Sequence, residues 1–335
     1  MIYLLIFLCT LNYFILRKFI YLSKVINLFD SPDNLRKIHS KKTANIGGFL
    51  IYLNLVAFFI FYLIETNFFI NNLFFLSKKE FFIFYTFLSL FFILGFIDDK
   101  FNLNANIKFI FFFIIIYSLL FFDSTILINE IIFSFYPDVI NIKNFNIFFT
   151  MLSFLLFINA FNMFDGINLQ SGIYSIIIFC IFIFKGVFVE ISIVLILSLI
   201  VFLYLNCKNK CFLGDNGSIL LSFIISFFFI KSYRSNQVFY ADEIFLIMLI
   251  PGLDLLRVSI FRIIKKKHPF EADRNHMHHF LIERFNLKKS LLLLFLPILI
   301  FNLLSLVFNM TVYFIIISFL YYFILFYYLN KNKIK

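Results

Sequence analysis

Four aspartates at the ends of long apolar stretches could bind a cation or a phosphate ester. Asp98 and Asp99 are adjacent, and neighbouring carboxylates repel each other unless a cation or a shared proton relieves the repulsion. Asp165 and Asp215 each adjoin a glycine, which lets the backbone turn tightly and bring a carboxylate close to a ligand. Carboxylate oxygens suit Mg²⁺, which usually takes one or two of them and leaves room for water and substrate phosphates. The structural alternatives are a solvated helix end for the pair and helix capping by the other two.

A histidine-rich segment later in the chain could bind anions. It contains Asp273, Arg274, His276, His278 and His279, and a run of lysines comes shortly before it. Histidines and an aspartate could instead bind zinc, which usually needs a cysteine or carboxylate at a suitable spacing. Because Arg274 and the lysines make the segment strongly basic, we interpret it as a diphosphate-binding loop. Contact with anionic lipid headgroups is a further alternative.

The elements that must position these residues are membrane-spanning helices. The chain has 335 residues, of which 63% are hydrophobic, and its mean hydropathy is +0.99. Soluble domains are only about 45–50% apolar. The formal net charge of +11 could indicate a nucleic-acid ligand. In a chain this apolar it favours basic cytoplasmic loops and a phosphate-rich substrate, so we expect no nucleic acid. The four cysteines do not form a disulfide framework.

Eleven apolar stretches approach the roughly 20 residues that a spanning helix needs. They are 1–23, 46–65, 81–97, 107–124, 146–164, 172–186, 188–206, 217–231, 241–262, 288–308 and 310–329. Only Gly186 separates the sixth from the seventh. The segment 125–145 alternates isoleucine with polar residues and predicts a short hairpin or an interfacial piece. The fold class is therefore an all-α polytopic membrane protein with about eleven transmembrane helices, in a single domain over residues 1–335.

The distribution of Lys and Arg predicts which side of the membrane each loop occupies. The odd-numbered loops and the C-terminal tail carry about 16 of these residues, and the opposite side carries about five. Cytoplasmic loops are enriched in Lys and Arg, so we expect the odd-numbered loops in the cytoplasm and the N-terminus outside. The four aspartates and the histidine-rich segment all fall on the cytoplasmic side. This agreement indicates one active site that faces the cytoplasm.

Five segments, taken in order, resemble the polyprenyl-phosphate N-acetylhexosamine-1-phosphate transferases, which form glycosyltransferase family 4. They are Asp30–His39 followed by Gly47 and Gly48, Gly95–Asp99, Asn159–Gly166, Gly214–Ser218 and Pro269–His279. The order and spacing of these segments make the match specific. The last segment is similar to the branch that transfers GlcNAc-1-phosphate to undecaprenyl phosphate. The related phospho-MurNAc-pentapeptide translocases, which carry consecutive histidines there, are the alternative.

The resemblance implies a reaction, a cofactor and a location. N-acetylhexosamine-1-phosphate would pass from a UDP-sugar to undecaprenyl phosphate with release of UMP, and Mg²⁺, or alternatively Mn²⁺, would be the cofactor. This would be the first membrane step in making a cell-envelope polysaccharide, such as the O-antigen of lipopolysaccharide. The protein would lie among the lipids of the bacterial inner membrane, and a homodimer is an open alternative. GlcNAc is the default sugar of the donor.

The resemblance also assigns roles to single residues. Asp98, Asp99 and Asp165 would be catalytic, and either Asp98 or Asp99 would act as a base or orient the lipid phosphate. Asp215 would be the principal metal ligand, joined by Asp98 and Asp165. The residues that would bind substrate are Arg36, His39, Lys108, Asn162, Asn168, Asp273, Arg274, His276, His278 and His279. The family often has an aspartate where this chain has Asn168, which can form hydrogen bonds but cannot carry charge.

Two other classes of protein could have this many spans. A polytopic transporter tends to place ionisable residues within its spans near the midplane, and its halves are often repeated. Here the polar residues crowd the ends of the stretches, and the sequence has no internal repeat. Asp254 and Arg257 are the exception, and we interpret them as an intrahelical pair or as part of the site wall. An inactive membrane scaffold would tolerate loss of the aspartates.

Overall fold

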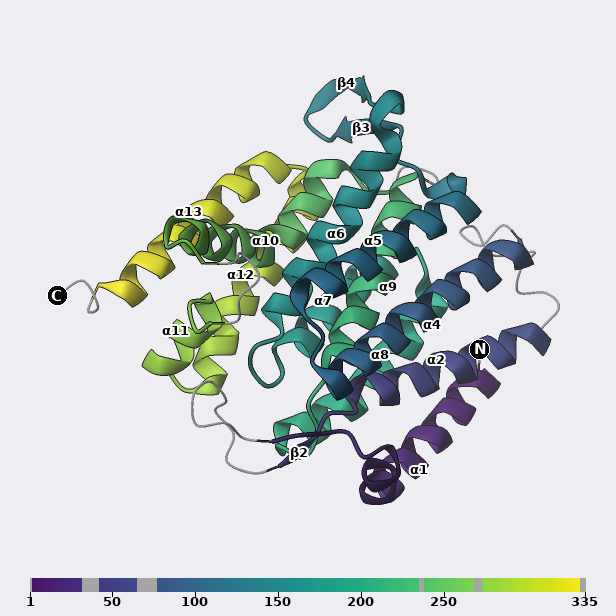
Figure 1. Cartoon of the computed structure of the whole chain (residues 1–335). Coiled ribbons are helices and arrows are strands. Elements are labelled where there is room, and N and C mark those ends of the chain that lie inside the picture. Colours follow the sequence, from purple (N-terminus) through teal and green to yellow (C-terminus); the bar gives the residue numbers. More distant parts are fainter. Residues whose placement is uncertain (1, 32–41, 65–76, 235–237, 268–272, 332–335) are drawn as a thin grey trace.

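This computed structural model describes residues 2–31, 42–64, 77–234, 238–267 and 273–331, and its described part is a bundle of helices (Figure 1). The long helices are α1 (Ile2–Ile26), α2 (Gly47–Ile64), α4 (Lys78–Phe101), α5 (Ala105–Phe122), α6 (Asn146–Phe164), α7 (Gln170–Phe184), α8 (Val189–Cys207), α9 (Asp215–Arg234), α10 (Ala241–Ile264), α12 (Leu287–Phe308) and α13 (Thr311–Asn330). A short helix, α11 (Met277–Arg284), precedes α12. The strands form two antiparallel pairs, β1 (Phe29–Asp30) with β2 (Thr43–Ala44) and β3 (Glu130–Phe133) with β4 (Tyr136–Asn141).

The predicted all-α membrane architecture is confirmed. Among the described residues, 10 helices are long and apolar enough to cross a membrane. The remaining predicted stretch, the sixth (172–186), forms α7, which has only 15 residues. At 1.5 Å per residue α7 is about 22 Å long, less than the roughly 30 Å of a hydrocarbon core.

Two local predictions are also confirmed. Gly186 separates α7 from α8 and has a φ of +72°, a left-handed conformation that glycine adopts without steric cost. Its backbone N–H donates to the carbonyl of Ile183, which closes the last turn of α7. The segment 125–145 contains the β3–β4 hairpin, which lies at the top of Figure 1, at the opposite end of the bundle from β2.

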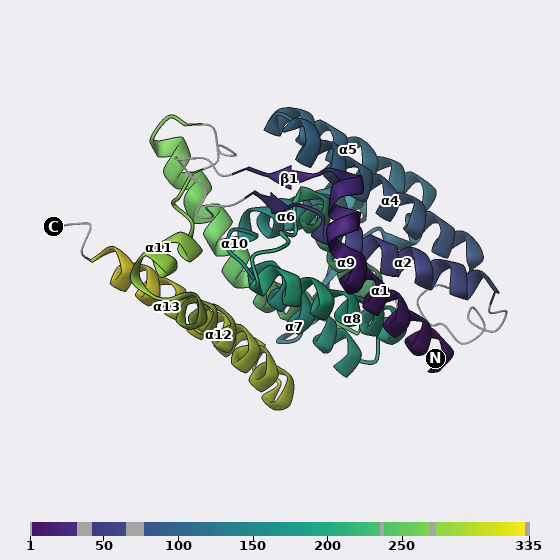
Figure 2. The same cartoon turned by 90° about the horizontal axis from the view of Figure 1, so that it is seen from below.

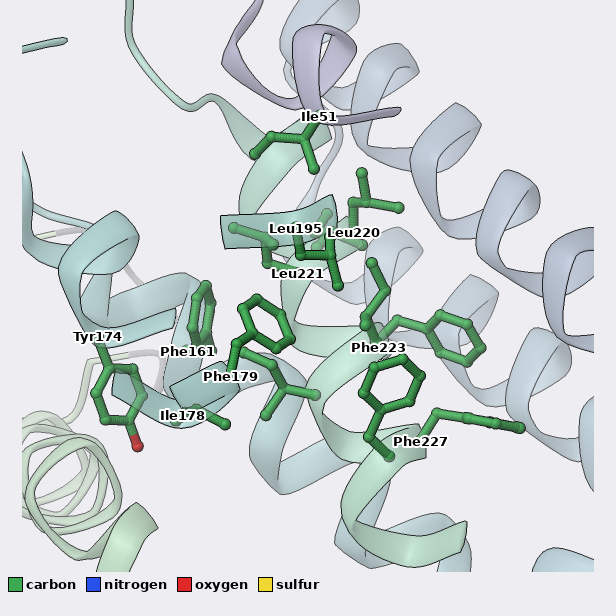
Figure 3. Packing of buried hydrophobic residues seen from close by; sticks show 14 of the residues in the cluster. Ile51, Phe161, Tyr174, Ile178, Phe179, Leu195, Leu220, Leu221, Phe223 and Phe227 are labelled. Carbon is green, nitrogen blue, oxygen red and sulfur yellow. The ribbon is translucent and has the colours of Figure 1, made fainter. Parts of the chain in front are cut away.

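Helix α9 forms the centre of the bundle. Every residue in its most apolar window is buried, which is not true of any other candidate span in the described chain. Figure 2 shows α9 enclosed by its neighbours when the bundle is seen from below, and Figure 3 shows Phe223 and Phe227 of α9 within the hydrophobic cluster. The hydroxyls of Ser222, Ser226 and Ser232 bond to carbonyls of the same helix, as Ser222 does to Ile219 at 2.8 Å. Small side chains that satisfy their own hydroxyls let other helices pack closely on all sides of α9.

Two prolines inside helices each leave a backbone carbonyl without its usual donor, and a tyrosine hydroxyl replaces that donor in both cases. Pro251 of α10 has no N–H for the carbonyl of Ile247, to which the Tyr174 hydroxyl of α7 donates at 2.9 Å. Pro297 of α12 likewise frees the carbonyl of Leu293, to which the hydroxyl of Tyr321 in α13 donates at 2.7 Å. An unpaired carbonyl is costly in an apolar medium, so these bonds join α7 to α10 and α13 to α12.

Tyr321→Phe tests this replacement of donors. We expect it to lower the free energy of unfolding by about 1 kcal/mol, because the Leu293 carbonyl loses its partner. In a Pro297→Ala background the loss should shrink toward zero, since the alanine N–H restores the helical bond to Leu293. Thermal unfolding of the four proteins in one detergent measures the coupling, with the exposed Tyr313→Phe as control. An equal cost of Tyr321→Phe in both backgrounds would contradict the explanation.

Candidate active site

Three segments meet at the start of α9. The backbone N–H groups of Gly47 and Gly48 in α2 donate to the carbonyls of Phe212 and Leu213 at 2.9 and 3.0 Å. A Cβ on Gly48 would lie 2.2 Å from the Asn216 side-chain oxygen, so a larger residue would not fit there. This close packing fixes the loop before α9 against the start of α2.

Asp99 binds the N-terminus of α9. One carboxylate oxygen accepts hydrogen bonds from the backbone N–H of Asp215 at 2.9 Å and from the side-chain amide of Asn45 at 2.6 Å. The other oxygen accepts from the backbone N–H of Asn216 at 2.8 Å and from its side-chain amide at 2.5 Å. The first N–H groups of a helix have no partner within the helix, and Asp99 supplies one for two of them. Four donors therefore occupy a side chain for which the resemblance implied a catalytic role.

Asp98 lies on a different side of α4 and contacts another set of residues. Its side chain is 2% exposed, and it accepts a hydrogen bond from the backbone N–H of Leu103 at 2.9 Å. The Lys108 ammonium of α5 contacts Asp98 directly and lies 3.6 Å from the carboxylate of Asp215. Lys108 thus bridges two of the predicted metal ligands. A third of the Asp215 side chain remains exposed.

Asp165 and Asn162 connect the end of α6 to the same site. The Ser218 hydroxyl in the first turn of α9 donates to the Asn162 side-chain oxygen at 2.8 Å. The Ser171 hydroxyl donates to Asp165 at 2.5 Å. Burial, helped by the negative charge of Asp215, raises the pKa of Asp165 to about 7, although the hydrogen bond from Ser171 lowers it. Asp165 is therefore a carboxyl that a neighbouring cation would readily ionise.

Asn168 belongs to a cluster of side-chain amides. It donates to Asn209 at 2.5 Å and accepts from Asn206 at 3.4 Å, while Asn206 also accepts from the backbone N–H of Leu169 at 2.6 Å. Leu169 has a φ of +71°, which is strained for a residue with a side chain. The geometry favours a role for Asn168 in holding this loop against the end of α8. Its predicted role in substrate binding stays a prediction.

The histidine-rich segment packs against the loop of Asp165. A Cβ on Gly166 would lie 1.9 Å from Nε2 of His278, so the imidazole rests on the glycine backbone. His278 is 1% exposed, and its Nδ1 has no hydrogen-bond partner in the described chain. The rings of His278 and His279 lie 4.3 Å apart. The structure therefore brings two segments together that are more than 100 residues apart in the sequence.

Burial also keeps two of these histidines neutral. It lowers the pKa of His278 well below its usual range, with the charges of His279 and His276 contributing. It lowers the pKa of His279 to about 4, with His276 and Arg274 contributing. Near pH 7 both imidazoles are uncharged and offer hydrogen bonds rather than positive charge.

His276 serves a different purpose, because both of its ring nitrogens are occupied. Arg262 donates to Nε2 at 3.3 Å, and a guanidinium can only donate, so Nδ1 carries the proton that is shared with Asp254 at 2.8 Å. Arg262 also donates to Asp273 at 3.0 Å. Burial opposes ionisation of Asp273, but the bond from Arg262 lowers its pKa below the usual range. These contacts attach the segment to α10.

Several residues at this site were not predicted from the sequence. Asn45 and Ser218 bond to predicted residues, and Arg262 holds the histidine-rich segment. Asp254, which the sequence suggested as an intrahelical partner of Arg257 or as part of the site wall, bonds to both Arg257 and His276. Ionisable residues inside a span are costly and are usually functional, which was a usable signal for Asp254.

The side chain of Arg274, one of the predicted substrate-binding residues, is exposed. The predicted substrate-binding residues Arg36 and His39 lie outside the described residues.

A metal site is compatible with this arrangement, although the described residues form no closed cage of ligands. In the described part of the chain no three His, Cys, Asp or Glu side chains converge on one point. Mg²⁺ commonly binds through one or two carboxylates and completes its shell with water and substrate phosphates. The exposed carboxylate of Asp215 fits this kind of site, with Asp98 and Asp165 near it as the Lys108 contact and the charge interaction show. The metal-ligand roles stay a prediction.

Known proteins share this sequence pattern. A sequence model of glycosyl transferase family 4 matches residues 81–233, which include the Asp98–Asp99 pair, Asp165 and Asp215. Over this region the chain is similar to glycosyl transferase family 4. This match confirms the resemblance, and it supports a transferase rather than a transporter.

Relatives extend the similarity over most of this chain. An undecaprenyl-phosphate alpha-N-acetylglucosaminyl 1-phosphate transferase of Thermotoga maritima is 29% identical over 85% of this chain and 83% of the relative. A probable undecaprenyl-phosphate N-acetylglucosaminyl 1-phosphate transferase of Bacillus subtilis is 26% identical over 76% of this chain and 69% of the relative. The Escherichia coli K12 undecaprenyl-phosphate alpha-N-acetylglucosaminyl 1-phosphate transferase is 25% identical, over 82% and 73%.

The contacts of Asp99 and Asp215 predict that substituting them has different effects on the stability of the protein. Asp99→Asn should lower the free energy of unfolding by about 2 kcal/mol or more, because its new NH₂ group would face donors that now bond to a carboxylate. Asp215→Asn should cost under about 1 kcal/mol, since that side chain is partly exposed and the change removes a negative charge near Asp98. Thermal unfolding in one detergent compares the two. Equal losses of stability would show that Asp99 does not hold α9.

Proposed function

We propose that this protein transfers N-acetylhexosamine-1-phosphate, with GlcNAc as the sugar, from a UDP-sugar to undecaprenyl phosphate and releases UMP. The observation that carries the proposal is that Lys108 contacts both Asp98 and Asp215 at the start of α9, with Asp165 near enough to interact with the charge of Asp215. The histidine-rich segment packs on the loop of Asp165. The printed names of the relatives support this acceptor and this transferred group.

The reaction needs positioning and charge neutralisation more than acid–base chemistry. An oxygen of the lipid phosphate attacks the β-phosphorus of the donor, and the bond from that phosphorus to the bridging oxygen breaks. UMP leaves with the bridging oxygen and its electron pair. The lipid phosphate is already ionised, so no proton has to be removed from it. Phosphoryl transfer of this kind depends on cations and oriented donors around the phosphates.

Asp98 and Asp99 then have separate roles. Four donors surround Asp99, which leaves it to position α9 rather than to act as a base. Asp98 forms an ion pair with Lys108, and Lys108 also lies beside Asp215. In the proposed reaction this ion pair orients the phosphate of the acceptor. We therefore propose Asp98 with Lys108 for the acceptor and Asp99 for the architecture of the site.

Asp215 is the proposed principal ligand of Mg²⁺, with Mn²⁺ as an alternative, and Asp98 and Asp165 are the further ligands. Their carboxylate oxygens are the donors that these hard cations prefer. When bound, the cation would neutralise negative charge on the phosphates during transfer. Asp165 is held by Ser171 at the edge of this set, in the loop that His278 covers.

The donor is proposed to bind on the histidine side. Both nitrogens of His276 bond to protein groups, whereas Nδ1 of His278 has none in the described chain. We therefore assign donor contacts to His278, His279 and the exposed Arg274, with Asp273 holding the loop through Arg262. Neutral imidazoles offer hydrogen bonds to the sugar or the diphosphate, and Arg274 offers positive charge.

The acceptor's polyprenyl chain has a candidate binding site between α6, α9 and α10. A cavity of about 430 Å³ lies there, and its lining is almost entirely apolar. The residues that line it include Phe157, Phe229, Ile230, Phe245, Met248 and Leu253. Cavities of a few hundred Å³ with apolar walls are typical of sites for apolar ligands. This cavity supports a lipid as one of the two substrates.

We also propose the location of the protein. The excess of Lys and Arg supports an orientation with the aspartates and the histidine-rich segment in the cytoplasm, where UDP-sugars are made. The bacterial relatives support the bacterial inner membrane and the first step of a cell-envelope polysaccharide. A homodimer stays an alternative for the assembly.

Transfer activity tests the proposed function. Purified protein with Mg²⁺, undecaprenyl phosphate and radiolabelled UDP-GlcNAc should yield a labelled lipid and UMP. EDTA should stop the reaction and added Mg²⁺ should restore it. Asp215→Asn should lower kcat by at least about 100-fold because the cation loses its main ligand. Asp138→Asn, in the exposed strand β4, is the matched control and should keep full activity.

Two outcomes would contradict parts of this proposal. No labelled lipid with any UDP-N-acetylhexosamine would overturn the transferase function. Full activity of Asp215→Asn would place the metal elsewhere.

Native cysteines test the orientation. Cys207 is exposed at the end of α8 that faces the site, whereas Cys211 is buried. In a Cys9→Ser, Cys180→Ser variant, a membrane-impermeant maleimide should label Cys207 in inverted membrane vesicles and not in intact cells, because the reagent reaches only one face. The control is labelling after detergent permeabilisation, which should be equal in both preparations. Labelling of intact cells would reverse the proposed orientation.

A further inference from the structure

A buried tyrosine of α13 belongs to the polar cluster beneath the histidine-rich segment. The hydroxyl of Tyr322 donates to Asp254 at 3.0 Å and accepts from Nε of Arg257 at 2.8 Å. Arg257 closes the ring by donating to Asp254 at 2.7 Å. Tyr322 and Asp254 are 1% and 3% exposed, so each of these bonds forms away from water. Removing one of them leaves a buried group unpaired, which costs more than the bond itself contributes.

The same two charged residues hold the backbone of the histidine-rich segment. Asp254 accepts from the backbone N–H of Met277 at 3.0 Å and from the ring of His276 at 2.8 Å. Arg257 donates to the backbone carbonyl of Asn275 at 2.6 Å. Three consecutive residues of the segment are thus fixed by the pair that Tyr322 completes. His278, which rests on Gly166, comes one residue later.

Other contacts of α13 reinforce this attachment. The Arg257 guanidinium lies over the ring of Phe326 at 4.4 Å, and that ring lies 6.0 Å from Phe280 of α11. Arg284 at the end of α11 donates to the carbonyl of Tyr328 at 2.5 Å. Helix α13 therefore packs along α11, which contains His278 and His279, and Figure 1 shows the two helices on the same side of the bundle.

We propose that Tyr322 is a positioning residue that sets the affinity for the UDP-sugar, acting through Asp254 and Arg257 on the histidine-rich segment. The inference rests on the proposed function, because it assigns donor binding to that segment. Tyr322 itself does not touch a substrate. Its hydroxyl fixes the orientation of Asp254, and Asp254 fixes His276 and Met277, so the position of His278 and His279 depends on a helix at the C-terminal end of the chain.

Tyr322→Phe in the full-length protein tests this role, with Tyr321→Phe as the matched control. Both changes remove one hydroxyl from α13, but that of Tyr321 bonds to Leu293 in α12 and not to the cluster. Tyr322→Phe should raise KM for UDP-GlcNAc about tenfold while kcat changes less, because loss of a bond to a charged group loosens a loop that binds the donor. KM for undecaprenyl phosphate should not change. Tyr321→Phe should lower stability and leave both KM values unchanged.

The rate of chemical modification of His276 gives a second measurement, which does not depend on enzyme activity. His276 is 6% exposed with both nitrogens bonded, so diethylpyrocarbonate should modify it slowly in the unchanged protein and in Tyr321→Phe. Modification should be several times faster in Tyr322→Phe, as followed by mass spectrometry of the peptide. If no UDP-sugar is turned over but Tyr322→Phe still exposes His276, the attachment is upheld and the proposed function fails. Unchanged KM and unchanged modification in Tyr322→Phe would overturn the inference.

Arg257→Lys provides an alternative if Tyr322→Phe does not fold. Lysine keeps the positive charge beside Asp254 but cannot bond to Tyr322 and to the Asn275 carbonyl together. The expected result is the same rise in KM for the donor and the same faster modification of His276. A folded Arg257→Lys protein with unchanged values for both would overturn the inference.

Discussion

The bond between the Asp99 carboxylate and the start of α9 is the constraint on which the rest of the site depends. α9 is buried over its whole apolar length, and its first N–H groups would otherwise be unpaired. Asp99 accepts from two of them, and one belongs to Asp215. The predicted metal ligand is therefore held by its own backbone to a carboxylate of α4. The negative charge at a helix N-terminus is also favourable to the helix dipole.

That bond requires α4 and α9 to approach very closely, and glycine permits the approach. Gly95 lies four residues before Asp99, on the same face of α4. A Cβ there would lie 2.5 Å from the carbonyl oxygen of Asp215. Gly48 plays the same part for α2, next to Asn216. The glycines that surround the aspartates in the sequence thus serve packing between helices as well as turns in loops.

The sequence predicted most of the fold because hydropathy and chain breaks are local signals. The break at Gly186, the hairpin near Pro137 and every apolar stretch were readable from neighbouring residues alone. The adjacent Asp98 and Asp99 could not be told apart in this way. Successive residues of a helix point about 100° apart, so the two carboxylates face different neighbours. Which neighbours they face depends on how α4 packs against α5 and α9.

The histidine-rich segment shows the same limit on sequence reasoning. Its three histidines look equivalent in the sequence, yet His276 is bonded on both sides whereas His278 keeps a buried nitrogen without a partner in the described chain. The difference arises from Asp254 and Arg262 of α10, which only the folded chain brings to this segment. The sequence shows that Asp254 is an ionisable residue inside a span. Its function in holding the histidine-rich segment is seen only in its contacts with His276 and Met277.

The site has an aspartate side, beside the start of α9, and a histidine side, formed by the histidine-rich segment. The different charges of these two sides favour different ligands. In the described chain Lys108 lies between Asp98 and Asp215, and Asp165 is near enough to interact with the charge of Asp215. A phosphate approaching this side meets more negative than positive charge, so it would bind favourably only with a further cation between phosphate and carboxylates. The other side offers neutral imidazoles and the exposed Arg274, which under the proposed function would bind a diphosphate without a further cation. Under the proposed function, a cation would therefore bind where the two sides meet, because there the carboxylates would face both phosphorylated substrates.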